Sequence, residues 1–116
     1  MKILSAQVHG YLDYVTVAIF LAAPTLLGLE GVPLILAYVL AIIHFTMTVL
    51  TDFPLGGIKL IPFTIHGKVE LLVGVAIPAT PFLLGFEGIA FNFYLGVGIV
   101  IFIVGFITDY APERAA

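Results

Sequence analysis

The sequence predicts an all-α fold, a four-transmembrane-helix bundle made of two tandem helical hairpins related by a pseudo-two-fold axis along the membrane normal. Three observations lead to this prediction. The chain is very apolar, it contains four apolar stretches of membrane-spanning length, and its two halves repeat one pattern of polar, proline and glycine residues. We expect a single integral membrane domain over residues 1–116, with the repeats at residues 8–54 and 65–111.

The composition favours lipid as the solvent of this chain. Of 116 residues, 62% are hydrophobic and 9% are charged, whereas about a quarter of the residues are charged in an ordinary soluble domain. So few polar residues cannot cover the surface of a small protein in water, so the lipid bilayer is the expected partner. The net charge of −3 and the lack of a basic run argue against nucleic acid. The absence of cysteine excludes disulfides and thiolate metal sites.

Four stretches have the length that a membrane-spanning helix needs, which is about 20 mostly apolar residues. They cover residues 8–29, 32–51, 65–86 and 89–108. The first and third stretches contain Asp13 and Glu70 near their beginnings. Their uninterrupted apolar parts are therefore slightly short, and the two acids are expected within or at the edge of the membrane.

The charges between the spans predict the orientation. Lys2, Lys59, Lys68 and Arg114 all fall at one end of the expected bundle, whereas the two turns at the other end carry Glu30 and Glu87. Because cytoplasmic loops are enriched in lysine and arginine, we expect a multi-pass protein of the cell (inner) membrane with both termini in the cytoplasm.

The repeat is visible when the chain is aligned with itself at an offset of 57 residues, the separation of His9 and His66. Residues 9–53 then match residues 66–110 without a gap. Each copy holds two spans, so the copies share one orientation, as in parallel repeats related by an axis along the membrane normal. The matched positions include His9 with His66, Gly10 with Gly67, Asp13 with Glu70, Pro24 with Pro81, Gly31 with Gly88, and Thr51-Asp52 with Thr108-Asp109.

Each copy also carries a proline motif late in its first helix, Ala23-Pro24-Thr25 and Thr80-Pro81-Phe82. With the His-Gly beginnings and the Leu-Leu-Gly ends of these helices, the pattern resembles the SPW-repeat family of small bacterial integral membrane proteins. The proline matches in both copies, while the serine and tryptophan of the family motif match in neither. The resemblance covers most of the chain; it implies a small membrane protein of the cell envelope and brings no established activity.

Three prolines lie inside the apolar stretches and predict helix kinks: Pro24, Pro78 and Pro81. Proline removes a helical hydrogen bond and leaves a carbonyl without its donor. These kinks either turn the chain into the outer hairpin or open a cavity around the freed carbonyls.

The glycines have two expected uses. Gly31 and Gly88 suit the left-handed conformation of tight helix–helix turns. Small residues inside the later spans allow helix backbones to approach closely, within the chain or in a homo-oligomer. These small residues are Ala37, Ala41, Gly96, Gly98 and Gly105.

The spacing of the polar residues predicts a buried layer near the cytoplasmic face. Residues four apart share a helix face, so His9 projects with Asp13 and His66 with Glu70. Asp52 and Asp109 end the second and fourth spans at a similar depth. The expected layer contains two histidines and four carboxylates. A purely structural layer, hydrogen-bonded within itself and pinning the hairpins together, explains the same pattern.

A deeper histidine breaks the repeat. His44 lies well inside the second span, and Thr48 and Thr51 follow on the same face, which predicts a polar stripe leading to Asp52. The matching positions in the second copy include Ile101 and Gly105. Its alternative explanation is a buried histidine bonded to a threonine or to a freed carbonyl.

Three functions are compatible with this layer. The first is ion or proton handling through His9, Asp13, His44, Thr48, Asp52, His66, Glu70 and Asp109, since histidine titrates near neutral pH. The second is a divalent metal site made by His9, Asp13, His66 and Glu70, or a haem held by the two histidines. The third is a structural accessory subunit of a larger membrane complex. We expect no enzyme, because no nucleophile–base pattern, phosphate loop or dinucleotide fingerprint is present.

Overall fold

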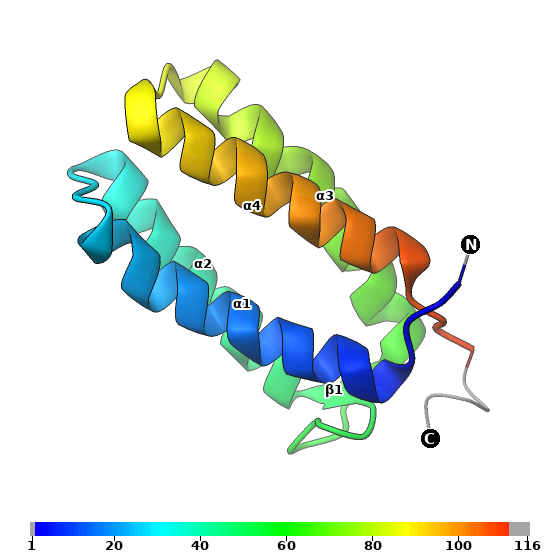
Figure 1. The fold of residues 1–116 in the computed structure, drawn as a ribbon. Coiled ribbons are helices and arrows are strands. Elements are labelled where there is room, and N and C mark those ends of the chain that lie inside the picture. Colours follow the sequence, from blue (N-terminus) through cyan, green and yellow to red (C-terminus); the bar gives the residue numbers. More distant parts are fainter. Residues whose placement is uncertain (1, 112–116) are drawn as a thin grey trace.

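The computed structural model describes residues 2–111, which form four helices and one small parallel sheet (Figure 1). Helices α2, α3 and α4 are each long and apolar enough to cross a membrane, which indicates a membrane protein. Helix α1 has 21 residues but includes His9 and Asp13. The all-helical prediction is confirmed, and the helices lie within a few residues of the predicted spans. They are α1 (Ala6–Leu26), α2 (Val32–Val49), α3 (Phe63–Leu84) and α4 (Gly88–Ile107), with strands β1 (Thr51–Asp52) and β2 (Ile61–Pro62).

Consecutive helices form two hairpins. The backbone of α1 lies close to that of α2, and the backbone of α3 lies close to that of α4. The two hairpins face each other mainly through their side chains (Figure 1). The turns after α1 and after α3 lie at one end of the molecule, while the beginning of α1, strand β1 and the end of α4 lie at the other. We call these the turn end and the sheet end.

The turns at the turn end depend on glycine. Gly31 and Gly88 have positive φ angles of 62° and 59°, so the predicted left-handed conformation is confirmed. Gly28 and Gly85 share it, with φ angles of 72° and 69°. A side chain is strained in this region of backbone space, which accounts for glycine on both sides of each turn.

The prolines are accommodated within the helices. Helix α1 continues two residues beyond Pro24, and α3 continues through Pro78 and Pro81 to Leu84. Pro78 lies against α4 at Gly98, where an added Cβ atom would be 2.3 Å from the proline Cδ. At this crossing, Gly98 is what allows α4 to approach the proline ring. The kinks expected at the three prolines stay a prediction.

Short extended segments join the helices at the sheet end. Thr51 pairs with Ile61 in the parallel sheet that connects α2 to α3. Leu4, just before α1, forms a parallel bridge with Thr108, just after α4. In this second pairing the backbone N–H of Asp109 donates to the carbonyl of Leu4 at 2.9 Å. Each pairing therefore brings a threonine to the beginning of a histidine-bearing helix.

An apolar core fills the space between the hairpins beyond the sheet end. Tyr94 connects them near the turn end, where its hydroxyl donates to the carbonyl of Pro33 at 2.5 Å. Large apolar side chains also cover the outer surface, with Leu26 82%, Leu83 80% and Leu72 70% exposed. An outer surface of this kind fits contact with lipid. The core consists of Phe20, Leu29, Ala37, Ala41, Ile77, Tyr94 and Ile101.

The α3/α4 crossing gives a first prediction. Gly98→Ala places a Cβ atom against the ring of Pro78, so we expect a loss of about 1–3 kcal/mol in the free energy of unfolding. Gly96→Ala is the matched control, because its Cβ would meet no atom within 4 Å. The measurement is unfolding by a denaturing detergent, with no more than one chain per micelle. Equal stability of the two variants would contradict the packing described here.

Candidate functional site

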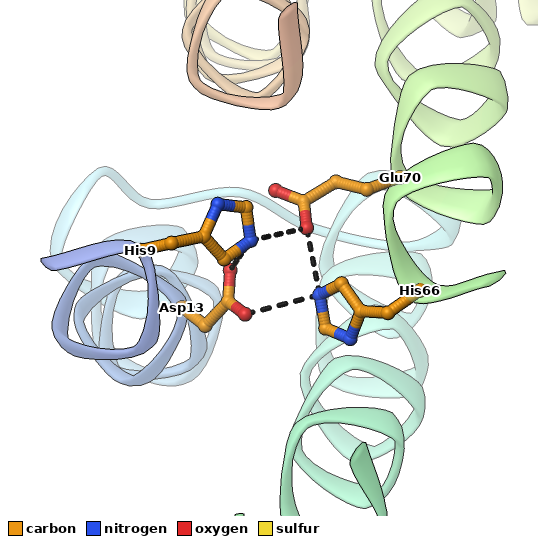
Figure 2. Close-up of side chains that lie close together, drawn as sticks. All are labelled: His9, Asp13, His66 and Glu70. Carbon is orange, nitrogen blue, oxygen red and sulfur yellow. Dashed lines mark hydrogen bonds and ion pairs between the residues drawn. The ribbon is translucent and has the colours of Figure 1, made fainter. Parts of the chain in front are cut away.

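Two histidines and two carboxylates meet between α1 and α3 (Figure 2). His9 and Asp13 come from α1, and His66 and Glu70 come from α3, each pair one helical turn apart. The four residues are 0%, 1%, 1% and 4% exposed, respectively. We call them the His/carboxylate cluster. Because the i,i+4 spacing places both members of a pair on one helix face, two facing helices suffice to assemble it.

Each carboxylate of the cluster lies between both imidazole rings. Oε2 of Glu70 is 2.9 Å from Nε2 of His9 and 2.8 Å from Nε2 of His66. The Asp13 carboxylate is 3.2 Å from Nε2 of His9 through Oδ1 and 3.1 Å from Nε2 of His66 through Oδ2. One potential ligand atom from each of the four residues lies within 4.8 Å of all the others. The four side chains thus point at one small volume (Figure 2).

The other nitrogen of each ring faces a threonine hydroxyl. Nδ1 of His9 is 2.7 Å from Oγ1 of Thr108, and Nδ1 of His66 is 2.8 Å from Oγ1 of Thr51. Both hydroxyls donate to backbone carbonyls at 2.6 Å, those of Val104 and Met47. A hydroxyl has a single hydrogen, so each threonine accepts from an Nδ1–H group. In the neutral rings, Nε2 is therefore the atom with a free lone pair, and it faces the carboxylates.

Aromatic rings close the cluster at the sheet end. The ring of Phe63 lies 5.5 Å from that of His9 and 5.9 Å from that of His66, between centroids. The ring of Tyr110 lies 5.6 Å from that of His9. Burial raises the pKa of the Tyr110 hydroxyl above its ordinary value. The cluster is thus separated from water on the side where the chain termini lie.

Glycine makes this close packing possible. A Cβ atom on Gly10 would lie 2.8 Å from the ring of Phe53, and one on Gly67 would lie 2.7 Å from the ring of Tyr110. Each glycine directly follows a histidine of the cluster. A larger residue at either position would push the segment after α2 or after α4 away from the site.

His44 reaches the edge of the cluster from α2. Its Nε2 atom lies 3.4 Å from Oδ1 of Asp13, and its side chain is 14% exposed. With His66 and Glu70 it lines a cleft between α2 and α3 of about 430 Å³, including the part that is open to the outside. The remaining lining is apolar: Phe20, Leu40, Ile43, Met47, Val69, Val73 and Ile77. This cleft faces the apolar outer surface of the protein.

The predicted threonine stripe from His44 to Asp52 is wrong. The hydroxyl of Thr48 donates to the backbone carbonyl of His44 at 2.8 Å, as threonines commonly do four residues along a helix. Thr51 turns instead to His66. Asp52 is exposed in β1, so the stripe ends inside the protein at a histidine of the cluster.

The predicted four-carboxylate layer is likewise corrected. Asp13 and Glu70 are the two acids whose oxygen atoms, among the described residues, lie with the histidine nitrogens. Asp52 is at the surface. Asp109 follows α4, half-buried, and its carboxylate accepts from the backbone N–H of Ala111 at 3.0 Å. The helix ends carry these acids past the level of the histidines.

Thr108 is the site residue that sequence reasoning missed. Its signal was present, because the repeat aligns it with Thr51. A threonine at the end of an apolar helix usually bonds only to the preceding turn, and its contact with His9, 99 positions away in the chain, becomes visible only in the fold.

Comparison with protein-family models, with curated proteins and with solved structures found no match to this chain. The resemblance to the SPW-repeat family therefore stays a prediction, carried by the residues quoted for it.

The donor set fits a metal ion and does not fit a haem. Imidazole nitrogen and carboxylate oxygen are ligands of Zn²⁺ and related divalent ions, and two of each complete a tetrahedral site. A haem between His9 and His66 would need the space between their Nε2 atoms. That space is flanked by carboxylate oxygens within 3.2 Å of both nitrogens. The porphyrin ring has no room there.

The threonine contacts give a second prediction. Thr51→Val and Thr108→Val each leave a buried Nδ1–H group without its acceptor, so each is expected to cost about 1–3 kcal/mol in the free energy of unfolding. Thr48→Val is the control, because Thr48 is equally buried but bonds only to the carbonyl of its own helix. Unfolding of the purified protein in detergent measures the three values. An equal cost for all three would mean that the threonine–histidine bonds contribute nothing specific.

Proposed function

We propose that this chain is a four-span membrane protein that binds one divalent metal ion in the His/carboxylate cluster. One observation carries the proposal. Two imidazole Nε2 atoms and two carboxylates, from helices of different hairpins, converge within 4.8 Å while threonine holds each Nδ1 atom. A hydrogen bond at the other ring nitrogen is the usual outer support of a metal-binding histidine, because it fixes the tautomer and the orientation of the ring.

Charge supports a cation at this position. With neutral histidines, Asp13 and Glu70 give the cluster two negative charges in a place that is almost fully buried. Buried charges are costly unless they are paired or bind a metal. A divalent cation balances both carboxylates and meets both Nε2 lone pairs at once.

Distances support an ion of transition-metal size. Bonds of about 2.0–2.2 Å to nitrogen and oxygen place neighbouring ligand atoms of a tetrahedral site about 3.3–3.5 Å apart. The nitrogen–oxygen distances of 2.8–3.2 Å lie slightly below this range, so a small outward movement of the side chains suffices. All four ligands come from the protein, as in a structural site, and a bound ion would join α1 to α3.

The membrane arrangement is part of the proposal. Helix α1 joins the three apolar helices as a fourth span, because its polar residues face α3 instead of lipid. Paired contacts support a pseudo-two-fold axis along the membrane normal. The bond between His9 and Thr108 corresponds to that between His66 and Thr51 at an offset of 57 residues. The bridge between Leu4 and Thr108 corresponds in the same way to the pair Thr51 and Ile61.

The sheet end is proposed to face the cytoplasm. Lys2 and Lys59 lie there and donate to the backbone carbonyls of Phe106 and Phe53. Glu30 and Glu87 lie in the turns at the other end. This distribution agrees with the positive-inside rule. Arg114, the remaining cation of the sequence argument, lies outside the described residues.

Metal binding gives a third prediction. Protein purified without chelator is expected to contain one divalent metal ion per chain by elemental analysis. After removal of that ion, Co²⁺ should bind with the visible absorption of a tetrahedral site. Asp13→Asn and Glu70→Gln each remove a direct ligand, so both should weaken binding by at least about 100-fold, beyond the loss typical of outer partners. Asp52→Asn, a change of an exposed carboxylate, should leave the affinity unchanged.

Two results would overturn this function. A protein that binds no divalent ion above the level of the double variant Asp13→Asn, Glu70→Gln has no metal site; its cluster is then a proton-exchanging or purely structural layer, the two alternatives from the sequence. An Asp13→Asn effect without a Glu70→Gln effect would show that the two pairs do not act as one site.

Orientation gives a fourth prediction. The chain has no cysteine, so single cysteines report accessibility without background. Ile58→Cys, in the exposed loop at the sheet end, should react with a membrane-impermeant maleimide only in inside-out vesicles. Leu27→Cys, in the turn after α1, should react only in intact cells. The reverse pattern would invert the proposed topology.

A further inference from the structure

One glycine of the helices has no use within the chain. An added Cβ atom at Gly96 of α4 would meet nothing within 4 Å, and Gly96 does not lie at positive φ. A glycine inside a helix is less favourable than other residues unless something packs against it. Gly96 lies about 12 Å from the beginning of α4 at the rise of an α-helix. The helix glycines that do meet a neighbour are Gly10, Gly67, Gly74, Gly98 and Gly105.

A polar residue lies on the same face one turn earlier. Asn92 is exposed on the outer surface of α4, where no hydrogen bond joins its amide to another described residue. Asn92 and Gly96 line a groove between α1 and α4 of about 770 Å³, including its open part. The rest of the groove is almost entirely apolar; it is lined by Thr16, Ile19, Ala23, Phe93, Val97, Val100 and Ile101. A side-chain amide facing hydrocarbon needs a partner from outside the chain.

The matching face of α2 lacks both features. At the offset of 57 residues, Ile35 takes the place of Asn92 and Val39 takes the place of Gly96. These two residues are 62% and 43% exposed, as expected of side chains that contact lipid. A hairpin of this shape therefore does not itself require an amide or a glycine here. The substitution is specific to α4.

We propose that α4 packs against α4 of a second copy of this chain, with Gly96 at the crossing and the two Asn92 side chains hydrogen-bonded to each other. An amide carries both donor and acceptor, so two copies related by a two-fold axis satisfy each other, as a self-complementary interface requires. Glycine lets the two backbones approach, and polar side chains then bond across membrane helices. The grooves beside α4 receive the partner's exposed apolar side chains. This interface lies away from the His/carboxylate cluster and does not depend on metal binding.

Cysteine crosslinking in membranes tests this interface. Val100→Cys, in the α4 groove, should give an oxidised dimer at twice the mass of the chain. Ile43→Cys is the matched control, since it occupies the equivalent position on α2 and is 55% exposed, against 56% for Val100. Equal crosslinking at both positions, or none at Val100, would refute the interface. A product at another mass would assign the face to a different protein.

A second measurement separates assembly from folding. Energy transfer between labelled chains, followed as lipid is diluted into vesicles, gives the dimer affinity. Asn92→Leu should weaken it about tenfold, the effect of one interhelical hydrogen-bonded pair, and Gly96→Leu should abolish it by separating the backbones. Neither change touches a neighbour within the chain, so the unfolding of the single chain should be unaffected. A dimer that survives Gly96→Leu, or a wild-type protein that is monomeric at every dilution, overturns the proposal.

Discussion

Two imidazole rings held between two carboxylates form the contact on which this structure depends. The polar atoms of the cluster are shielded from water, and no residue on one hairpin can satisfy them alone. His9 therefore needs Glu70, and His66 needs Asp13, from the opposite hairpin. Since the hairpins meet mainly through side chains, this cluster and the bond from Tyr94 to Pro33 fix how α1 faces α3. Breaking one partner would leave a buried charge uncompensated, which is far more costly than losing a surface ion pair.

The surroundings of the cluster follow from this requirement. Histidines can occupy the shared volume in one orientation only if the opposite ring nitrogen is also bonded, and Thr51 and Thr108 supply those bonds. The parallel pairings at the sheet end bring both threonines to the beginnings of α3 and α1. The glycines after the two histidines then leave room for Phe53 and Tyr110 to cover the site. The small sheet, which looks incidental in a helical protein, is thus the support of the centre.

Sequence reasoning found what local physics determines. Apolar length gave the helices, and the i,i+4 rule placed His9 with Asp13 and His66 with Glu70. It failed where tertiary contacts decide. Thr51 was assigned to a stripe ending at Asp52, yet its hydroxyl accepts from His66, because the turn after α2 swings Asp52 to the surface. Helix periodicity cannot see such a turn. Thr108 was passed over because its partner lies at the other end of the chain, a pairing that a repeat alignment implies only after the hairpins are docked.

Positions that depart from the repeat separate assembly from specialisation. Contacts shared at an offset of 57 residues, such as those of His9 and His66, are what two similar hairpins need in order to dock. His44 and Asn92 are different, because their counterparts Ile101 and Ile35 are apolar. Each lies in one of two equivalent grooves, α2 with α3 or α4 with α1. One groove ends at a histidine beside the cluster, and the other exposes an amide and a bare glycine backbone. The two faces are therefore suited to different partners: access to the buried centre belongs to the first, and contact between chains belongs to the second.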